Sequence, residues 1–332
     1  MRSLLEWVLD RFPHTPRKRA KQWIAAGRVR VGTEVIRRPD RIMPDPGGAL
    51  ELLDRSATGA TIVDEERRIH PRLTLMYMDS SLAVVNKSAG LLSVASGSRN
   101  ETSVLRIFRD FLKGGSSPRG RAAGLSLPPG FRSRTPLPVH RIDQYTSGLL
   151  CIAMNPAARK ILIEEFSAHR VVRQYVAYVD GRPSSPSGTW RHRLRLEDDG
   201  YRQTVDADPG SRASGKNVME AITEYEVLEE FAWRGRQITK LRLNLFTGCK
   251  HQIRIQAAQE GLPIIGDRTY HPRYSKAHEG SSVPVEIPRQ ALHAERLELT
   301  HPEQSGKRLT WTAPLPDDLM RLESVLRRKF QP

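Results

Sequence analysis

The sequence predicts an α+β fold: a mixed, mainly antiparallel sheet with flanking helices, preceded by a small N-terminal α/β unit. Strand-like segments follow one another through the second half of the chain, with few helical segments between them. Near the N-terminus, two short amphipathic segments precede a hairpin pattern. No internal repeat is visible, and 332 residues are too many for one ordinary compact domain, so we expect about two domains.

Composition restricts the classes of protein to consider. Lys and Arg total 53 against 37 Asp and Glu, which gives a net charge of +16 and an isoelectric point of about 10.3. This excess favours a polyanionic partner, with nucleic acid as the leading candidate and a generically basic protein as the alternative. Two cysteines exclude a disulfide framework and are too few for a structural zinc site. No segment reaches 18 consecutive apolar residues, so we expect a soluble cytoplasmic protein without metal or membrane contact.

The first predicted unit spans residues 1–60. Apolar side chains recur at helical spacing in residues 3–12. A second helix is expected from the N-cap Thr15, with a proline in its first turn, to Gly27. A hairpin follows, in which valines alternate with arginines on both sides of a turn at Gly32.

Basic side chains in this unit form a candidate RNA-binding surface. They are Arg17, Lys18, Lys21, Arg28 and Arg30. The second helix has an apolar stripe on one side and its cations on the other, which suits contact with phosphates; an ordinary solvated face is the alternative. The basic helix followed by Gly27-Arg28-Val29-Arg30-Val31-Gly32-Thr33 resembles the S4 domain, an RNA-binding module.

A polar stretch over residues 61–72 is predicted to link this unit to a larger one at residues 73–328. The first elements of the larger unit are predicted at residues 73–77 (strand), 82–85 (strand) and 104–112 (helix). Residues 113–138 are rich in Gly, Pro, Ser and Arg, so we expect a basic surface insertion there.

The stretch from His140 to Ala153 directs one carboxylate toward a turn that leads into a buried strand. Residues 148–153 form a continuous apolar run preceded by Thr-Ser, which is typical of a core strand entered from a loop. Asp143 therefore lies at the rim of a core, where we expect chemistry; a simple turn-forming aspartate is the alternative. Further elements are predicted at residues 155–170 (helix), 175–179, 221–228 and 240–246 (strands), and at a helix start that holds Arg254.

Several segments together resemble the RluA-type pseudouridine synthases, over roughly residues 70–325. The run His140-Arg141-Ile142-Asp143-x-x-Thr146-Ser147-Gly148 matches the catalytic motif of that family nearly position for position. Thr247-Gly248-x-x-His251-Gln252-Ile253-Arg254 matches its second motif, and Asn86-Lys87-x-Ala89-Gly90 and Ala291-Leu292-His293-Ala294 also fit. The resemblance implies isomerisation of uridine in structured ribosomal or transfer RNA: the bond from ribose C1′ to uracil N1 breaks and the ring rejoins through C5. It implies no cofactor and no metal, and we expect a monomer.

The resemblance also implies three catalytic residues. Asp143 would be the nucleophile, either by attacking the sugar or by promoting a glycal-type intermediate. Arg254 would keep this carboxylate ionised, because a nearby guanidinium favours the charged form. Tyr175 would stack on the target base and serve in proton transfer, with a core aromatic as the alternative.

RNA contacts are implied for residues around these three. Arg141 would fill the space that the extruded uridine leaves. His140 would contact phosphate or orient the loop, with a structural histidine as the alternative. Lys250 would contact RNA, although Cys249-Lys250, like Gln144 and Tyr145, departs from the common family pattern; these differences concern target choice more than the reaction.

Two other functions remain as alternatives. A non-catalytic S4-type RNA-binding or ribosome-associated protein would need the basic surface but not the trio Asp143, Tyr175 and Arg254. A hydrolase that uses Asp143 with His140 or His251 is weaker, because no nucleophile elbow or pair of metal ligands accompanies these residues in the sequence.

Overall fold

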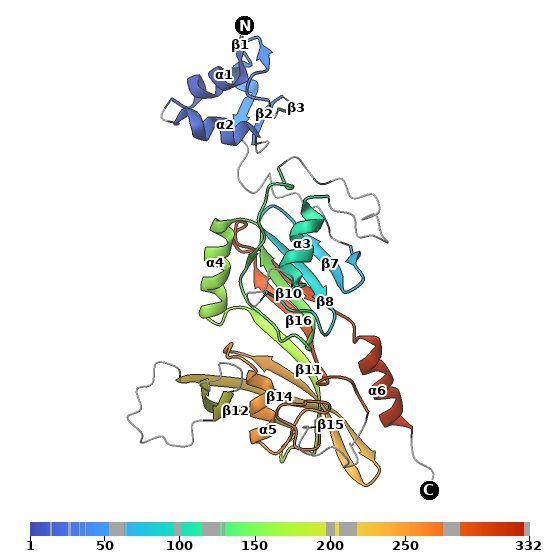
Figure 1. Ribbon diagram of the computed structural model, residues 1–332. Helices are drawn as coiled ribbons and strands as arrows, with labels where there is room; N and C mark the ends of the chain where they lie inside the picture. The colour runs from blue at the N-terminus through green and yellow to red at the C-terminus, as the bar shows by residue number, and fades with distance from the viewer. Residues whose placement is uncertain are drawn as a thin grey trace.

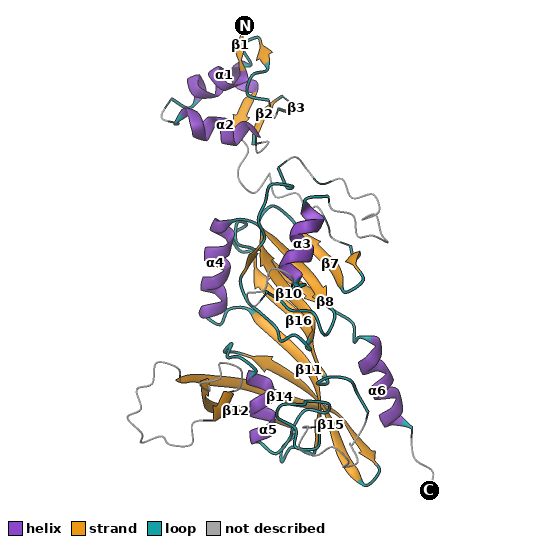
Figure 2. Cartoon of the chain, in the orientation of Figure 1, coloured by secondary structure: helices purple, strands orange, loops and turns teal. Residues whose placement is uncertain are grey.

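The computed structural model describes residues 1–332 except 14, 26–27, 33, 37, 53–62, 64, 96–100, 115–126, 128–129, 197–202, 206–217, 275–285 and 329–332. A small N-terminal unit precedes a larger unit that is built on one long sheet (Figure 1). Helices lie against this sheet rather than forming a separate bundle (Figure 2). The predicted α+β class, with a mainly antiparallel sheet, is confirmed.

The N-terminal unit consists of two helices and short strands around a core of its own. Its elements are β1 (Arg2–Ser3), α1 (Leu4–Arg11), α2 (Arg17–Ala25), β2 (Val29–Val31), β3 (Glu34–Val35), β4 (Ile42–Met43), the 3₁₀ turn Gly47–Ala49 and β5 (Leu50–Leu52). Ser3 and Glu6 form a capping box that starts α1. Strand β2 pairs with β3 and β5, and Gly32 makes the turn between β2 and β3 with a positive φ. The predicted helices and hairpin are therefore present.

The large sheet has the order β13-β12-β14-β15-β11-β16-β10-β8-β7-β6, with β17 beside β16 and β9 beside β10. Its strands are β6 (Arg67–His70), β7 (Leu73–Met78), β8 (Leu82–Lys87), β9 (Leu137–Pro138), β10 (Ser147–Ala153), β11 (Val172–Asp180), β12 (Ser187–Leu196), β13 (Gln203–Val205), β14 (Val218–Trp233), β15 (Arg236–Leu245), β16 (Leu292–Thr300) and β17 (Arg308–Thr312). Among these described strands, only β10 and β16 pair in parallel.

Alternation along β10 explains how helices cover both faces of one half of the sheet. Leu150 and Ile152 pack with α3 (Val104–Leu112), whereas Leu149 and Cys151 pack in the cluster that includes α4 (Pro156–Ser167). The other half of the sheet packs against α5 (Gln252–Gln259) and α6 (Asp317–Arg327).

The two halves of the sheet meet at Gly148. This glycine has a φ of +113°, and a Cβ placed there would lie 2.2 Å from the carbonyl oxygen of Ala294. Only two residue pairs join β10 to β16, beginning with Ser147 opposite His293. The turn before β10 is therefore fixed at the join between the halves, which positions Asp143 opposite the strand β11.

Residues 61–72 and 113–138 were predicted to be a linker and a basic insertion. Residues 61–72 are not simply a linker: Arg67–His70 form β6, which pairs with β7, and Val63 bridges Met78. The short Arg-Arg-Ile-His strand carries one apolar residue, so its sequence lacked a strand pattern. Most of the basic insertion at 113–138 lies outside the described residues.

Strands β12, β13 and β17 and helix α6 were not predicted. None of the described helices is long and apolar enough to span a membrane.

Candidate active site

Asp143 lies in a turn that several hydrogen bonds hold in place. The backbone N–H of Thr146 donates to the Asp143 carbonyl at 3.1 Å. Ser93 brackets the preceding residue, because its Oγ donates to the carbonyl of Ile142 at 2.8 Å and accepts from the N–H of Ile142 at 3.2 Å. The Asp143 side chain is 17% exposed and lines a groove of about 600 Å³. A carboxylate in this position is fixed and still accessible.

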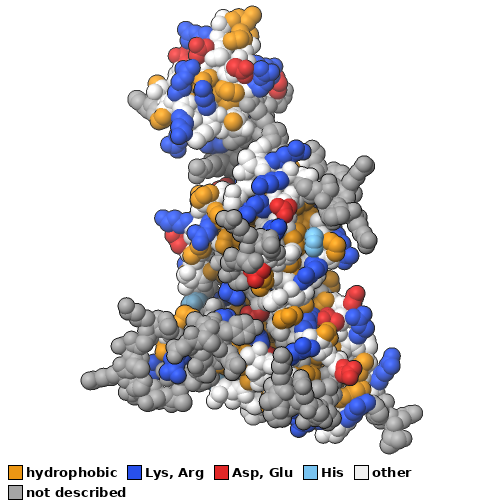
Figure 3. Space-filling view, viewed as in Figure 1, with side chains coloured by type: hydrophobic (Ala, Val, Ile, Leu, Met, Phe, Trp, Pro, Cys, Tyr) orange, Lys and Arg blue, Asp and Glu red, His pale blue; other side chains and the backbone are white. Residues whose placement is uncertain are grey.

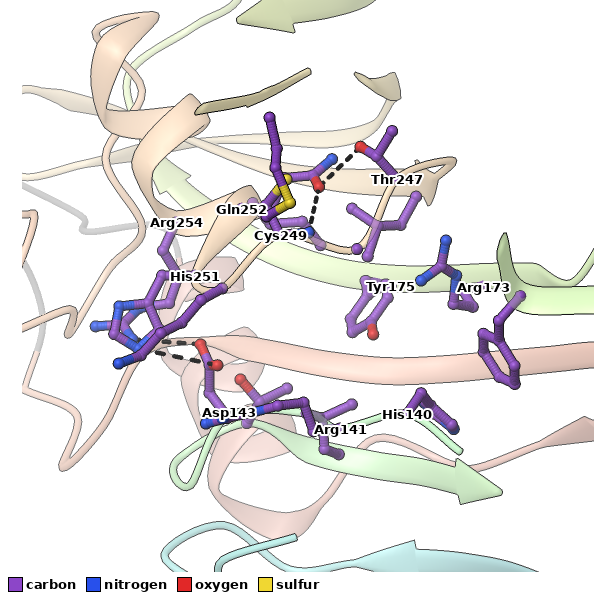
Figure 4. A pocket seen from close by; sticks show the side chains of 18 of the residues that line it. His140, Arg141, Asp143, Arg173, Tyr175, Thr247, Cys249, His251, Gln252 and Arg254 are labelled. Atoms are coloured by element: carbon purple, nitrogen blue, oxygen red, sulfur yellow. Dashed lines mark hydrogen bonds and ion pairs between the residues drawn. The ribbon is translucent and has the colours of Figure 1, made fainter. Parts of the chain in front are cut away.

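A fixed guanidinium faces this carboxylate (Figure 4). Arg254, in the first turn of α5, directs Nη1 toward Asp143 Oδ2 at 3.3 Å. The buried carboxylate of Asp267 holds the other side of Arg254 through two short contacts, of 2.6 Å to Nε and 2.8 Å to Nη2. Asp267 in turn accepts from the backbone N–H groups of Thr269 and Tyr270. Arg254 is thus oriented by one carboxylate and presented to another.

Electrostatics keeps Arg254 and Asp267 charged. Although burial opposes ionisation, the hydrogen bonds and positive charge of Arg254 keep the pKa of Asp267 below its usual value. Burial also disfavours the charged form of Arg254, but the hydrogen bonds and negative charges of Asp267 and Asp143 outweigh it and raise the pKa of Arg254 above its ordinary value. The guanidinium is therefore a permanent cation beside Asp143.

His251, at the N-terminal end of α5, approaches the other carboxylate oxygen of Asp143. Its backbone has a left-handed conformation with a φ of 55°. Nε2 lies 3.9 Å from Asp143 Oδ1, and Nδ1 is 3.0 Å from the hydroxyl of Tyr270. Burial lowers the pKa of His251 to about 4, so its ring is neutral near pH 7. His251 therefore lines the groove as a neutral, polar ring rather than as a second cation.

Tyr175 lies on β11 in the same groove, across from Asp143 (Figure 4). Its side chain is 6% exposed, and burial raises its pKa to about 12. At neutral pH the phenol keeps its proton. The structure thus brings the three predicted catalytic residues, Asp143, Tyr175 and Arg254, into one groove from three separate elements.

Lys87 fastens the Asp143 turn from behind, which the sequence had not indicated. Its side chain is fully buried at the end of β8, and Nζ donates to the carbonyls of Ser88, Leu91 and Gln144 at 3.2, 2.8 and 2.9 Å. The N–H of Gly90 also donates to the Gln144 carbonyl. Burial lowers the pKa of Lys87 to about 7. The Asn-Lys-x-Ala-Gly run, which the sequence marked only through the family resemblance, thus holds the turn through hydrogen bonds from Lys87 and Gly90 to the Gln144 carbonyl.

The predicted RNA-binding residues near the groove have different environments. Arg141 is exposed, and Lys250 lines the groove. His140 Nε2 accepts a hydrogen bond from the backbone N–H of Cys151 at 2.9 Å, its ring stacks on Phe166, and burial lowers its pKa to about 3. A neutral, engaged histidine supports the loop-orienting alternative over a phosphate contact.

In the N-terminal unit, Arg17, Lys18 and Lys21 project from α2 into solvent. Figure 3 shows basic side chains spread over the visible face of this unit. Arg30 differs, because Glu51 pairs with it through contacts of 3.2 Å from Nε and 2.5 Å from Nη2. Arg28 lies over the ring of Trp23 at 5.6 Å. The predicted basic surface is therefore strongest on α2 and partly neutralised on β2.

Fold and site together place one partly exposed carboxylate, Asp143, beside a buried guanidinium in a groove, in a chain whose charge suits a polyanionic substrate. No cluster of three or more potential metal ligands occurs among the residues that the structure describes. The family profile for RNA pseudouridylate synthase matches residues 81–259, which include Asp143, Tyr175 and Arg254.

Curated relatives and solved structures agree with this match. The chain is 31% identical to the ribosomal large subunit pseudouridine synthase D of Pseudomonas aeruginosa, over 96% of this chain and 89% of that protein. It is 30% identical to the protein of the same name from Escherichia coli, over 98% and 90%. The structure of human RNA pseudouridylate synthase domain containing 4 superposes with a TM-score of 0.56 at 21% identity, covering 76% of this chain and 92% of that one. The chain belongs to the RluA family of RNA pseudouridine synthases and is an RNA uridine isomerase.

Proposed function

We propose that this enzyme isomerises specific uridines of large-subunit ribosomal RNA, with Asp143 as the nucleophile after the uridine has been flipped out of its helix. The observation that carries the proposal is the 3.3 Å contact between Asp143 and an arginine that Asp267 already orients. The choice of ribosomal RNA rests on relatives that carry this substrate in their names and match nearly the whole chain. Transfer RNA remains the second candidate.

The chemistry requires a carboxylate that stays ionised while the groove loses water. Asp143 assists as the bond from C1′ to N1 breaks; the uracil turns, C1′ bonds to C5, C5 loses its proton and N1 gains one, so the reaction has no net loss or gain of atoms. Arg254 presents a positive charge to Asp143 through all of these steps, because this charge cannot be lost near neutral pH. Either sugar attack or a glycal-type route is compatible with this placement.

Substrate capture is divided between the groove and the surface. The protonated phenol of Tyr175 offers a flat face to a flipped base. Arg141 is exposed two residues before Asp143, which supports a role in which it enters the helix when the uridine leaves. Arg17, Lys18 and Lys21 add an S4-like phosphate-binding surface.

Two measurements test this function. Pseudouridine is mapped in total RNA from cells with and without the gene. Loss of defined large-subunit sites supports the proposal, whereas loss only in transfer RNA would identify transfer RNA as the substrate instead.

The second measurement uses a variant: Asp143→Asn keeps the shape of the side chain and removes its charge, so we expect turnover to fall by more than about a thousandfold with RNA affinity retained. Asp110→Asn, an exposed change on α3, is the control and should leave turnover unchanged. Equal activity of Asp143→Asn and the unaltered enzyme would refute the mechanism.

A further inference from the structure

Three arginines of the described chain are at least nine-tenths buried: Arg173, Arg254 and Arg289. Asp267 accepts two hydrogen bonds from Arg254, and Asp318 accepts two from Arg289 at 2.7 and 2.9 Å. Arg173 forms no ion pair with any carboxylate among the described residues. A buried cation without a counter-ion is costly, so this arginine needs an anion that the described chain does not supply.

The side chain of Arg173 is held in place nonetheless. Its Nη2 donates to the carbonyl of Phe246 at 2.7 Å, and its guanidinium lies 5.6 Å from the centre of the Phe166 ring. A Cβ at position 248 would lie 3.2 Å from Arg173 Nη1, so Gly248 leaves space for the guanidinium. The Nε atom is buried and has no hydrogen-bond partner. Burial lowers the pKa of Arg173 from its ordinary value, as expected for a charge removed from water.

Arg173 also has a defined position relative to the reaction centre. It lies two residues before Tyr175 on β11, so both side chains project from the same face of the strand and both line the groove. In Figure 4, Arg173 follows Tyr175 on the side away from His251. Two residues along a strand span about 6.6 Å, which is close to one nucleotide step of an extended RNA chain. A uridine at Asp143 and Tyr175 would bring a neighbouring phosphate to Arg173.

We propose that Arg173 binds a phosphodiester group next to the target uridine and so fixes how far the flipped nucleotide enters the groove. The proposal rests on the proposed function and extends it by a specific substrate contact. A guanidinium is suited to this task because its planar fork can donate two hydrogen bonds to one phosphate. An ion pair with the phosphate would supply the negative counter-charge that Arg173 lacks among the described residues of the free enzyme.

The test combines a protein variant with altered RNA. Oligonucleotides that span the mapped uridine carry a neutral methylphosphonate in place of one flanking phosphodiester at a time. Affinity and single-turnover rates are measured for the full-length enzyme and for Arg173→Gln. We expect Arg173→Gln to weaken binding by about tenfold or more, and one methylphosphonate to weaken binding of the unaltered enzyme equally. Combining the two changes should cost no more than either alone.

Controls separate this contact from a structural role. Arg170→Gln removes an exposed arginine just before β11, whose side chain pairs with Glu165, and it should leave both measurements unchanged. Arg173→Lys keeps the charge and should recover part of the affinity lost in Arg173→Gln. If the effects of Arg173→Gln and methylphosphonate multiply at every position, or if Arg173→Gln lowers only the rate, the proposal is wrong. Affinity decides this even without turnover, whereas an inactive unaltered enzyme on unmodified RNA would instead refute the proposed function.

Discussion

The catalytic groove and the N-terminal unit both depend on basic side chains, but they hold them differently. In the groove, Arg254 is 6% exposed and fixed by Asp267, so its direction is set before any substrate arrives. On α2, Arg17, Lys18 and Lys21 are exposed and can adjust to any phosphate nearby. A buried ion pair is expensive to build but directional, whereas exposed charges are inexpensive and non-specific. We therefore expect the groove to carry out the chemistry and the surface to add affinity for RNA.

After Asp143→Asn, the largest expected effect comes from releasing Arg254. Asp267→Asn removes the carboxylate that orients this arginine, so we expect turnover to fall by about a hundredfold or more and unfolding to become easier by about 3–5 kcal/mol. Single-turnover rates and urea denaturation measure the two effects. Asp180→Asn is a matched control, because it breaks the pair with Arg236 outside the groove. It should lower stability and leave turnover intact. A normal rate in Asp267→Asn would show that the orientation of Arg254 does not matter.

A second change concerns Lys87, which holds the Asp143 turn by donating to the Gln144 carbonyl. The pKa of Lys87 is lowered to about 7 by burial in the folded protein, whereas a lysine in the unfolded chain has its ordinary pKa of 10.5. Between these values the unfolded chain binds more protons, so the contribution of Lys87 to stability rises with pH from about 7 to about 10. Relative to Lys87→Met, the unfolding free energy of the unaltered enzyme should rise by at most about 1.4 kcal/mol per pH unit in this window.

Urea denaturation at several pH values measures that difference. Lys113→Met, at an exposed position, is the control and should give a difference that does not vary with pH. We also expect Lys87→Met to slow turnover, since the Gln144 carbonyl loses a donor. A pH-independent difference for Lys87→Met would mean that Lys87 remains charged in the folded protein throughout.

The smallest effect is expected from the surface. Changing Arg17, Lys18 and Lys21 together to Gln in the full chain should weaken RNA binding by about tenfold at 0.15 M salt. The slope of log K against the logarithm of the salt concentration should become less steep by about two. Turnover at saturating RNA should stay the same. The double change Arg38→Gln and Arg41→Gln is the control, since both arginines already pair with carboxylates of the same unit. Equal losses in the two variants would remove the distinction between free and paired cations.

Sequence alone was sufficient for the parts of this molecule that depend on local pattern. The apolar run of β10, the capped helices α3 and α4, and the hairpin around Gly32 all follow spacing and turn chemistry. Strand β6 did not, because its Arg-Arg-Ile-His sequence acquires strand structure only by pairing with β7.

The candidate site shows the same division. The motifs pointed to Asp143, Tyr175 and Arg254, and the structure places all three in the groove. Asp267 and Lys87 were missed as functional residues, since nothing local marks a carboxylate or a lysine as buried. The Gly266-Asp267 turn after an apolar run was the one available signal for Asp267. Long-range topology brings such residues together, and a single sequence does not encode that visibly.

The close approach at Gly148 has a consequence for how this enzyme can change over time. Because β10 and β16 touch where no side chain fits, any larger residue at position 148 would push the strands apart. Such a displacement would carry Asp143 away from Arg254, which lies on α5 and packs against the opposite half of the sheet. One backbone contact thus limits which residues position 148 can accept without disturbing the reaction centre.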